Sequence, residues 1–312
     1  MDRRQLNLVV GAAAVVVVGL LIWAIAAATG GGDDEAGDTT TIGVPEDCVE
    51  VPAAVSAEKV TLLTDLAESF NATDPEVDGQ CVRITIYRVA SGLGASQLAE
   101  GWSEVDTGAP APVLWSPSSS AWGAVVNHRL ALAGQTAIAN DFERIMITPL
   151  VLAMPKPMAE AMGWPEAEIG WSDVLALSQD PDGWGAYGHP EWGAFKLGKT
   201  NPNFSSSGLS ATAAIYYAAT GKVAGLTLDD IGSAATAEFV RGVEAATVHY
   251  GDTTMTFLEN MLREDLAGRP LSYVSAVAIE EVSIIAYNRG DPGDVGLENP
   301  TPPNVPLVAV YP

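Results

Sequence analysis

Cysteine, histidine and basic side chains are all scarce in this chain. Its 312 residues include 2 cysteines, 3 histidines and 15 lysines and arginines, against 39 aspartates and glutamates, for a formal net charge of −24. A metal centre usually takes several cysteine or histidine ligands at close spacing, and nucleic-acid phosphates are bound mainly by lysine and arginine. The histidines, His128, His189 and His249, are scattered. The composition therefore argues against a metal site and against a nucleic-acid partner.

The sequence also lacks the short motifs of several large enzyme classes. It has no Gly-x-Ser-x-Gly turn of a serine hydrolase, no His-Glu-x-x-His pair of a zinc protease and no Gly-x-x-x-x-Gly-Lys phosphate loop. Asp180 and Asp182 flank a proline before a glycine, a pattern that a polar turn explains more simply than calcium ligation does. We therefore expect neither enzymatic activity nor a cofactor.

One long apolar run stands near the N-terminus. Residues 8–28 carry no charge, and Arg3 and Arg4 precede them. A helix over this run would be about 31 Å long, enough to cross the hydrocarbon core of a bilayer. We expect residues 1–29 to form a cytoplasmic tip and a single-pass anchor in the cell membrane, with the bulk of the chain extracytoplasmic. A cleavable signal peptide is the alternative.

Beyond the apolar run, residues 30–46 are rich in Gly, Asp and Thr and predict a flexible linker. Both cysteines, Cys48 and Cys81, follow this linker. In an oxidising compartment a lone cysteine pair is more typical of a structural disulfide than of a metal site, which needs further ligands. We predict that they pair, and that the roughly 280 exported residues fold as two lobes.

From residue 47 onward, the apolar pattern alternates between strands and helices. Val82, Ile84 and Ile86, for example, have the period of a strand with two different faces. The expected strands are 48–55, 82–87, 113–115, 147–154, 275–279 and 307–311. The expected helices lie around 62–70, 91–98, 158–162, 172–178, 207–219, 239–246 and 257–266. Strands separated by helices predict an α/β fold with parallel strands and helices on both faces of a sheet.

Three polar turns stand where an expected strand gives way to a helix, at 90–92, 116–119 and 201–208. Backbone amides at a helix N-terminus have no internal partners and carry partial positive charge, so with serine hydroxyls they can bind an anion without a cation. Ligands of open α/β sheets lie at the carboxyl ends of strands. The turns therefore predict a ligand site, although each serine alone could simply cap its helix.

The order of these motifs resembles the type II periplasmic solute-binding proteins of the sulfate, molybdate and phosphate-like kind. Ala90-Ser91-Gly92, with Gly108-Ala109-Pro110 before Ser116, is similar to the first-lobe motif, and Asn201-Pro202 with Ser205–Gly208 is similar to the ligand loop of the second lobe. The resemblance implies a two-lobed (Venus-flytrap) fold, with lobe 1 at 47–150, lobe 2 at 151–290 and a return towards lobe 1 at 291–312. The residues that it implies as ligand-binding are Ser91, Gly92, Ser116, Ser119, Asn201, Ser205, Ser206 and Ser207.

The expected function is capture of a small ligand between the lobes, for transport or sensing. An oxyanion is favoured, because the turns offer neutral donors and no cluster of carboxylates. Closure around the ligand would be read by a transporter or an attached domain. Membrane-anchored bacterial proteins of this appearance often continue into a von Willebrand factor type A domain, and we expect the chain to be truncated at Pro312. The alternative is a ligand-free stalk or adhesion module that contacts proteins or the cell envelope.

Two tryptophans and two glutamates are ambiguous. Trp122 and Trp192 could wall a cleft, but tryptophan in an α/β protein is more often part of the core. Glu280 and Glu281 lie within an apolar strand or hinge segment, where a buried carboxylate either accepts a hydrogen bond from a ligand or bonds the backbone. We favour the core and the backbone interpretations.

Overall fold

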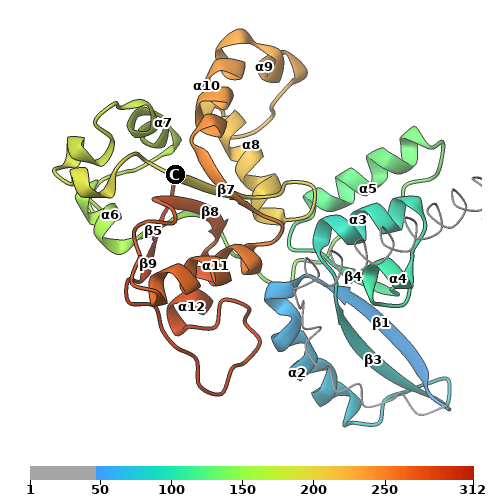
Figure 1. Ribbon diagram of the computed structural model, residues 1–312. Coiled ribbons are helices and arrows are strands. Elements are labelled where there is room, and N and C mark those ends of the chain that lie inside the picture. The colour runs from blue at the N-terminus through green and yellow to red at the C-terminus, as the bar shows by residue number, and fades with distance from the viewer. Residues whose placement is uncertain (1–46) are drawn as a thin grey trace, which may run out of the picture. The chain divides into compact units, whose positions relative to one another are not determined.

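The computed structural model describes residues 47–312, which form two β-sheets with helices packed on them (Figure 1). We call residues 47–149 the first lobe and residues 150–312 the second lobe, because each range carries one sheet. The predicted anchor and linker lie outside the described residues. Among the described helices, none has the length and apolar character that crossing a membrane requires.

The first lobe carries a four-stranded sheet in the order β2-β3-β1-β4. Its strands are β1 (Val49–Val55), β2 (Glu76–Val77), β3 (Gln80–Arg88) and β4 (Leu114–Ser116). Its helices are the 3₁₀ helix η1 (Ala57–Lys59), α2 (Val60–Asn71), α3 (Ser91–Glu100), α4 (Glu104–Thr107) and α5 (Ala121–Leu132). β1 is parallel to both β3 and β4, and β2 runs antiparallel to β3. The carboxyl ends of three strands therefore meet at one edge, where η1, α3 and α5 follow.

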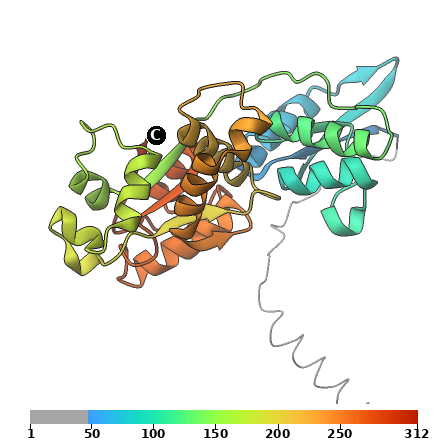
Figure 2. The ribbon, with the colours of Figure 1, turned by 90° about the horizontal axis from the view of Figure 1, so that it is seen from above.

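The apolar core of the first lobe is small. α3 and α5 lie side by side (Figures 1 and 2), and Ala95, Trp122 and Val126 are buried between them. α2 packs on β3 through Ala67, whereas the apolar side expected from residues 62–70 is largely exposed, with Leu66 56% accessible. The helical period was correct, but it does not say which side of a helix meets the sheet.

The second lobe carries a five-stranded sheet in the order β7-β6-β8-β5-β9. Its strands are β5 (Leu150–Pro155), β6 (Leu197–Thr200), β7 (Thr247–Gly251), β8 (Ala276–Glu280) and β9 (Leu307–Val310). Its helices are α6 (Lys156–Ala161), α7 (Trp171–Gln179), η2 (Gly183–Tyr187), η3 (Pro190–Trp192), α8 (Ser206–Thr220), α9 (Leu228–Gly232), α10 (Ala234–Ala245), α11 (Thr254–Leu266) and α12 (Glu281–Arg289). β6 is parallel to β7 and β8, whereas β5 is antiparallel to β8 and β9. The α/β prediction is confirmed, but all-parallel order is wrong here, because alternation does not encode strand direction.

Apolar side chains cover both faces of this second sheet. Leu152 and Met154 of β5 belong to one buried cluster, and Val151 and Ala153 belong to another. Successive side chains of a strand point to opposite faces, so a strand buried on both sides reads as a continuous apolar run. β5 and β8 are therefore central strands of the lobe.

The predicted return of residues 291–312 to the first lobe is wrong for its strand. β9 pairs with β5 in the second sheet, with Ala309 opposite Ala153. Asn288 brackets the start of β9, because its side chain accepts from the amide of Leu307 at 2.8 Å and donates to the carbonyl of the same residue at 2.9 Å. The sheet that a strand joins is set by such distant contacts, which a local apolar pattern does not contain.

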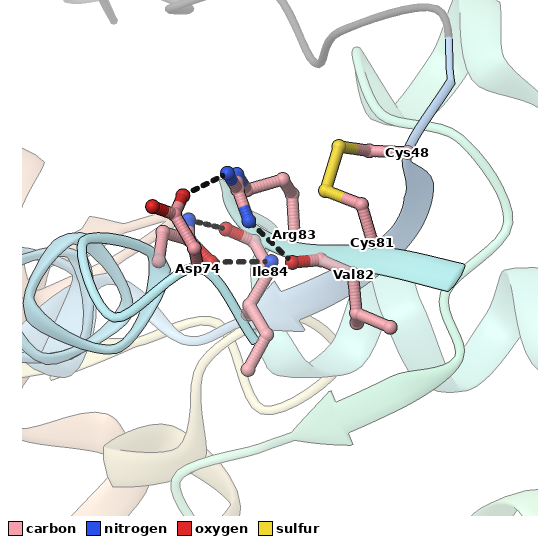
Figure 3. Close-up of a disulfide and its surroundings, with 7 residues drawn as sticks. Cys48, Asp74, Cys81, Val82, Arg83 and Ile84 are labelled. Carbon is pink, nitrogen blue, oxygen red and sulfur yellow. Dashed lines mark hydrogen bonds and ion pairs between the residues drawn. A yellow bond between two sulfur atoms is a disulfide. The ribbon is translucent and has the colours of Figure 1, made fainter. Parts of the chain in front are cut away.

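The predicted Cys48–Cys81 disulfide is confirmed (Figure 3). Cys48 directly precedes β1 and Cys81 lies in β3, so the bond links neighbouring parallel strands at their amino ends. Beside it, Arg83 forms an ion pair with Asp74 at 2.8 Å. Closing a loop with a sequence separation of 33 residues stabilises the folded state by about 3 to 4 kcal/mol in the chain-entropy model.

Candidate functional site

Two serine turns of the first lobe lie next to each other at the carboxyl ends of β3 and β4. Ser91 is buried at the start of α3, and its Oγ accepts a hydrogen bond of 3.1 Å from the amide of Ser118. The two hydroxyl oxygens are 3.3 Å apart. The turn at 90–92 and the turn at 116–119 are therefore in direct contact through Ser91 and Ser118.

A buried lysine that the sequence analysis did not consider lies under the second of these turns. Lys59 is 5% exposed, and its ammonium donates to the carbonyl of Ser116 at 3.0 Å, to the hydroxyl of Ser116 at 2.9 Å and to the carbonyl of Pro117 at 2.9 Å. Burial lowers the pKa of Lys59, and the Glu58 carboxylate acts in the opposite direction. The available sequence signal was its position four residues after an apolar strand.

The turn of the second lobe is a cluster of hydroxyls between β6 and α8. Thr200, the last residue of β6, donates to Ser205 at 2.8 Å, and the Oγ of Ser207 lies 2.9 Å from both of these hydroxyls. Ser207 also lies 2.7 Å from the hydroxyl of Thr254 at the start of α11. All four side chains converge where α8 and α11 begin, so two helix N-termini face one point.

A carboxylate closes this cluster at the end of β8. Glu280 accepts a hydrogen bond of 3.3 Å from Thr254. Burial, together with the nearby charge of Glu58, raises the pKa of Glu280 to about 7, although hydrogen bonds from its own backbone, Thr254 and Ser207 act in the opposite direction. Glu281 turns elsewhere and accepts from the hydroxyl of Tyr311. Glu280 thus bonds hydroxyls of the cluster as well as the backbone, which the favoured interpretation did not include.

Two of the predicted residues shape turns. The Oγ of Ser119 accepts a hydrogen bond of 3.2 Å from the amide of Ala121, the first residue of α5. The side-chain oxygen of Asn201 accepts from the amide of Asn203 at 3.0 Å. Ser119 thus has a local role at the start of α5, which was the alternative for the serines, and Asn201 bonds within its own turn.

The turns of the two lobes meet directly. The amide of Gly92 donates to the carbonyl of Phe204 at 3.0 Å, and the indole N–H of Trp122 donates to the Oγ of Ser206 at 2.7 Å. A Cβ at position 92 would lie 2.1 Å from the carbonyl oxygen of Asn203, so only glycine permits this approach. Trp122 is buried, as expected, and it also links the lobes. Six predicted residues, Ser91, Gly92, Ser116, Ser205, Ser206 and Ser207, thus belong to one connected region.

A small cavity lies between the lobes. A cavity of about 10 Å³, room for about one water molecule, lies between Glu58 of the first lobe and Met255, Val282 and Asp294 of the second. A larger cavity of about 400 Å³ lies within the second lobe, between α11 and the loop after α12, and none of the predicted residues lines it. Within residues 47–312, no three His, Cys, Asp or Glu side chains are grouped so that they could hold a metal ion.

Two α/β sheets whose donor-bearing turns face each other define a protein of the periplasmic-binding class. Residues 51–287 match the family of bacterial extracellular solute-binding proteins, so the chain belongs to this family. The match spans the meeting turns of both lobes. No curated protein matches the chain.

Several solved structures are similar to the chain at low identity. The Azotobacter vinelandii periplasmic molybdate-binding protein is 14% identical, with a TM-score of 0.34 over 77% of this chain and 74% of that one. The substrate-binding domain of a putative molybdenum ABC transporter from Clostridium difficile is 12% identical, with a TM-score of 0.38 over 84% of each chain. An ABC transporter solute-binding protein from Agrobacterium radiobacter K84, in complex with ribitol, is 12% identical, with a TM-score of 0.38 over 86% of this chain and 72% of that one. Likeness at this level carries no argument about the ligand.

Proposed function

We propose that residues 47–312 capture a small ligand between the serine turns of the two lobes, outside the cytoplasm. The observation that carries this proposal is the pair of hydrogen bonds between the turns, from Gly92 to Phe204 and from Trp122 to Ser206. They bring the N-termini of α3 and α8 together, and helix N-termini offer amide donors to a ligand. A ligand that contacts both turns favours the state in which the lobes meet, and a transporter or an attached domain can respond to that shift.

Binding in this scheme is an exchange of hydrogen bonds. The amide of Gly92 already has a protein acceptor, Phe204, and the hydroxyl of Ser206 already has a protein donor, Trp122. A ligand that enters takes over the amide of Gly92 from Phe204, while the Oγ of Ser206 keeps its bond from Trp122 and gives its own proton to the ligand. Leaving a buried donor without a partner costs about 1 to 3 kcal/mol, so an exchange of partners is favoured over the loss of one.

An oxyanion is the proposed ligand. Hydroxyls and helix N-termini supply neutral donors, and Glu280, with a pKa of about 7, is partly protonated near neutral pH and then adds one donor of its own. The proposed location is the cell membrane, through the anchor at residues 1–29, with a cytoplasmic N-terminus. A von Willebrand factor type A domain beyond Pro312 and a transporter partner remain predictions from the family resemblance.

A second candidate is a ligand-free stalk or adhesion module. The observation in its favour is that the turns satisfy each other, beside a cavity that holds about one water molecule. In that case the lobes form a fixed unit that presents its acidic surface to envelope components.

Calorimetric titration of the full chain in detergent distinguishes the two candidates. The panel contains sulfate, molybdate, phosphate, neutral sugars and amino acids, and the variants are Ser91→Ala and Ser206→Ala. Saturable binding that both variants weaken at least tenfold supports ligand capture in the site. A panel without any binding, together with adhesion to envelope preparations, supports the stalk and overturns ligand capture.

A further inference from the structure

Lys59 differs from the other buried lysine of the described chain. Lys199 of β6 is 2% exposed and forms an ion pair with Glu244. Lys59 has no ion-pair partner among residues 47–312, and neutral oxygens of residues 116 and 117 accept all three of its ammonium protons. Burying a cation without a paired anion is costly, and a neutral donor would hold the turn as well. A buried ammonium without an ion pair therefore suggests a role beyond the fold.

The charge of Lys59 acts at the hydroxyl of Ser116. An ammonium has donors only, so Ser116 Oγ must accept the hydrogen bond of 2.9 Å from Lys59, and its own proton must point to another acceptor. The same logic applies across the lobes, because the indole N–H of Trp122 is a donor only and occupies the Oγ of Ser206 at 2.7 Å. Within the described residues, neither hydroxyl has a second partner that accepts its proton.

We propose that Lys59 and Trp122 are positioning residues that fix Ser116 and Ser206 as hydrogen-bond donors, one on each lobe, and that Lys59 gives this site its preference for anions over uncharged ligands. This inference rests on the proposed capture of a small ligand between the lobes. Lys59 itself does not touch the ligand, because its three protons are already used. It acts through Ser116, whose donor strength rises when a cation occupies its lone pair.

The carboxylates nearby do not cancel this effect. The carboxylate of Glu58 accepts from the hydroxyl of Ser56 at 2.6 Å and makes no hydrogen bond to Lys59. Glu280 lies among the hydroxyls of the second lobe, bonded by Thr254. Both carboxylates therefore already have protein donors, whereas the two oriented hydroxyls have protons to give.

The test is a titration of the full chain in detergent with molybdate, sulfate and phosphate, and with the uncharged polyol ribitol, in wild type, Lys59→Met, Ser116→Ala and the double variant. We expect Lys59→Met to weaken anion binding at least tenfold and to leave ribitol binding unchanged. The double variant should lose no more than the stronger single variant, because Lys59 acts through Ser116. Lys199→Met is the matched control for losing a buried lysine, with thermal unfolding measured for every variant, and it should keep its anion affinity.

Each outcome of this titration supports or overturns the role of Lys59, the anion preference or ligand capture. Wild-type anion binding that Lys59→Met leaves intact, in a variant that folds, overturns the role of Lys59 and leaves ligand capture standing. Wild-type binding of ribitol without any anion overturns the anion preference but still supports capture. Absence of all binding overturns both proposals.

Variants that keep Lys59 still test the proposal when Lys59→Met misfolds. If Lys59→Met does not fold, Ser116→Ala and Trp122→Phe decide, because both keep Lys59. Each should weaken anion binding at least tenfold, the first by removing a donor and the second by releasing the lone pair of Ser206. Unchanged anion affinity in Ser116→Ala overturns the proposal.

Discussion

The first lobe buries two small apolar clusters, whereas the second lobe covers both faces of a five-stranded sheet with apolar side chains. The first lobe also leaves much of the apolar side of α2 exposed, and it carries the disulfide. A small core contributes little free energy of folding, so a covalent tie and contacts to a neighbour matter more. The comparison indicates that the second lobe is the stable platform and that the first lobe depends on Cys48–Cys81 and on the meeting turns.

Removing the disulfide should have the largest effect on the difference in stability between the two lobes. Replacing Cys48 and Cys81 together by serine should lower the free energy of unfolding of the first lobe by about 3 to 4 kcal/mol, because the unfolded chain regains its loop entropy. Urea titration followed by amide hydrogen exchange should show the first lobe losing protection before the second. Equal loss in both lobes would show that they unfold as one unit, against the distinction drawn above.

Blocking the close approach of the two turns at Gly92 should have the next largest effect on stability. Gly92→Ala places a Cβ 2.1 Å from the carbonyl oxygen of Asn203, so the turns must separate and the Gly92–Phe204 and Trp122–Ser206 hydrogen bonds weaken. We expect a loss of about 1 to 3 kcal/mol in thermal unfolding. Gly232→Ala is the control, because nothing lies within 4 Å of its Cβ position. A Gly92→Ala variant as stable as Gly232→Ala would contradict the close approach.

Two tryptophans allow a matched test of contacts between and within lobes. Trp122 donates to Ser206 across the lobes at 2.7 Å, and Trp184 donates to Ser275 inside the second lobe at 3.0 Å. Each Trp→Phe substitution should cost about 1 kcal/mol, because a buried serine loses its donor. Only Trp122→Phe should speed hydrogen exchange at the amide of Gly92. Equal exchange in both variants would mean that the indole bond does not hold the lobes together.

The pH dependence of the second-lobe cluster tests one titrating group of the second lobe. The folded-state pKa of Glu280, about 7, lies above its ordinary value of 4.5, so the native state binds more protons between these values than the unfolded chain does. Its contribution to stability is fully present below about pH 4.5 and is lost as the pH rises through 7. Glu280→Gln should reduce the fall in the free energy of unfolding between about pH 5 and pH 8 by about 2 kcal/mol, measured by thermal unfolding. Glu281→Gln, whose partner is the surface Tyr311, is the control. An unchanged slope in Glu280→Gln would assign the pH dependence to other groups.

Local patterns predicted much of this molecule. The cysteine pair followed from redox chemistry, and α3 and α8 begin at or within one residue of the expected Ser91 and Ser207. The predictions that failed, or that could not be made, concern contacts between residues far apart in the sequence. Lys59 reads as a solvated helix residue until residues 116 and 117, 57 and 58 positions away, bury it. β9 joins β5 across a separation that no local pattern spans.

The position of the disulfide has a mechanical consequence. β1 and β3 pair over seven positions, from Val49 opposite Val82 to Val55 opposite Arg88, which is about 20 Å of strand. The covalent tie holds one end of this ribbon, and the helices η1, which ends at Lys59, and α3, which begins at Ser91, follow its other end. The disulfide therefore keeps the two strands from sliding past each other at their amino ends. The disulfide lies a full strand length away from the proposed ligand site.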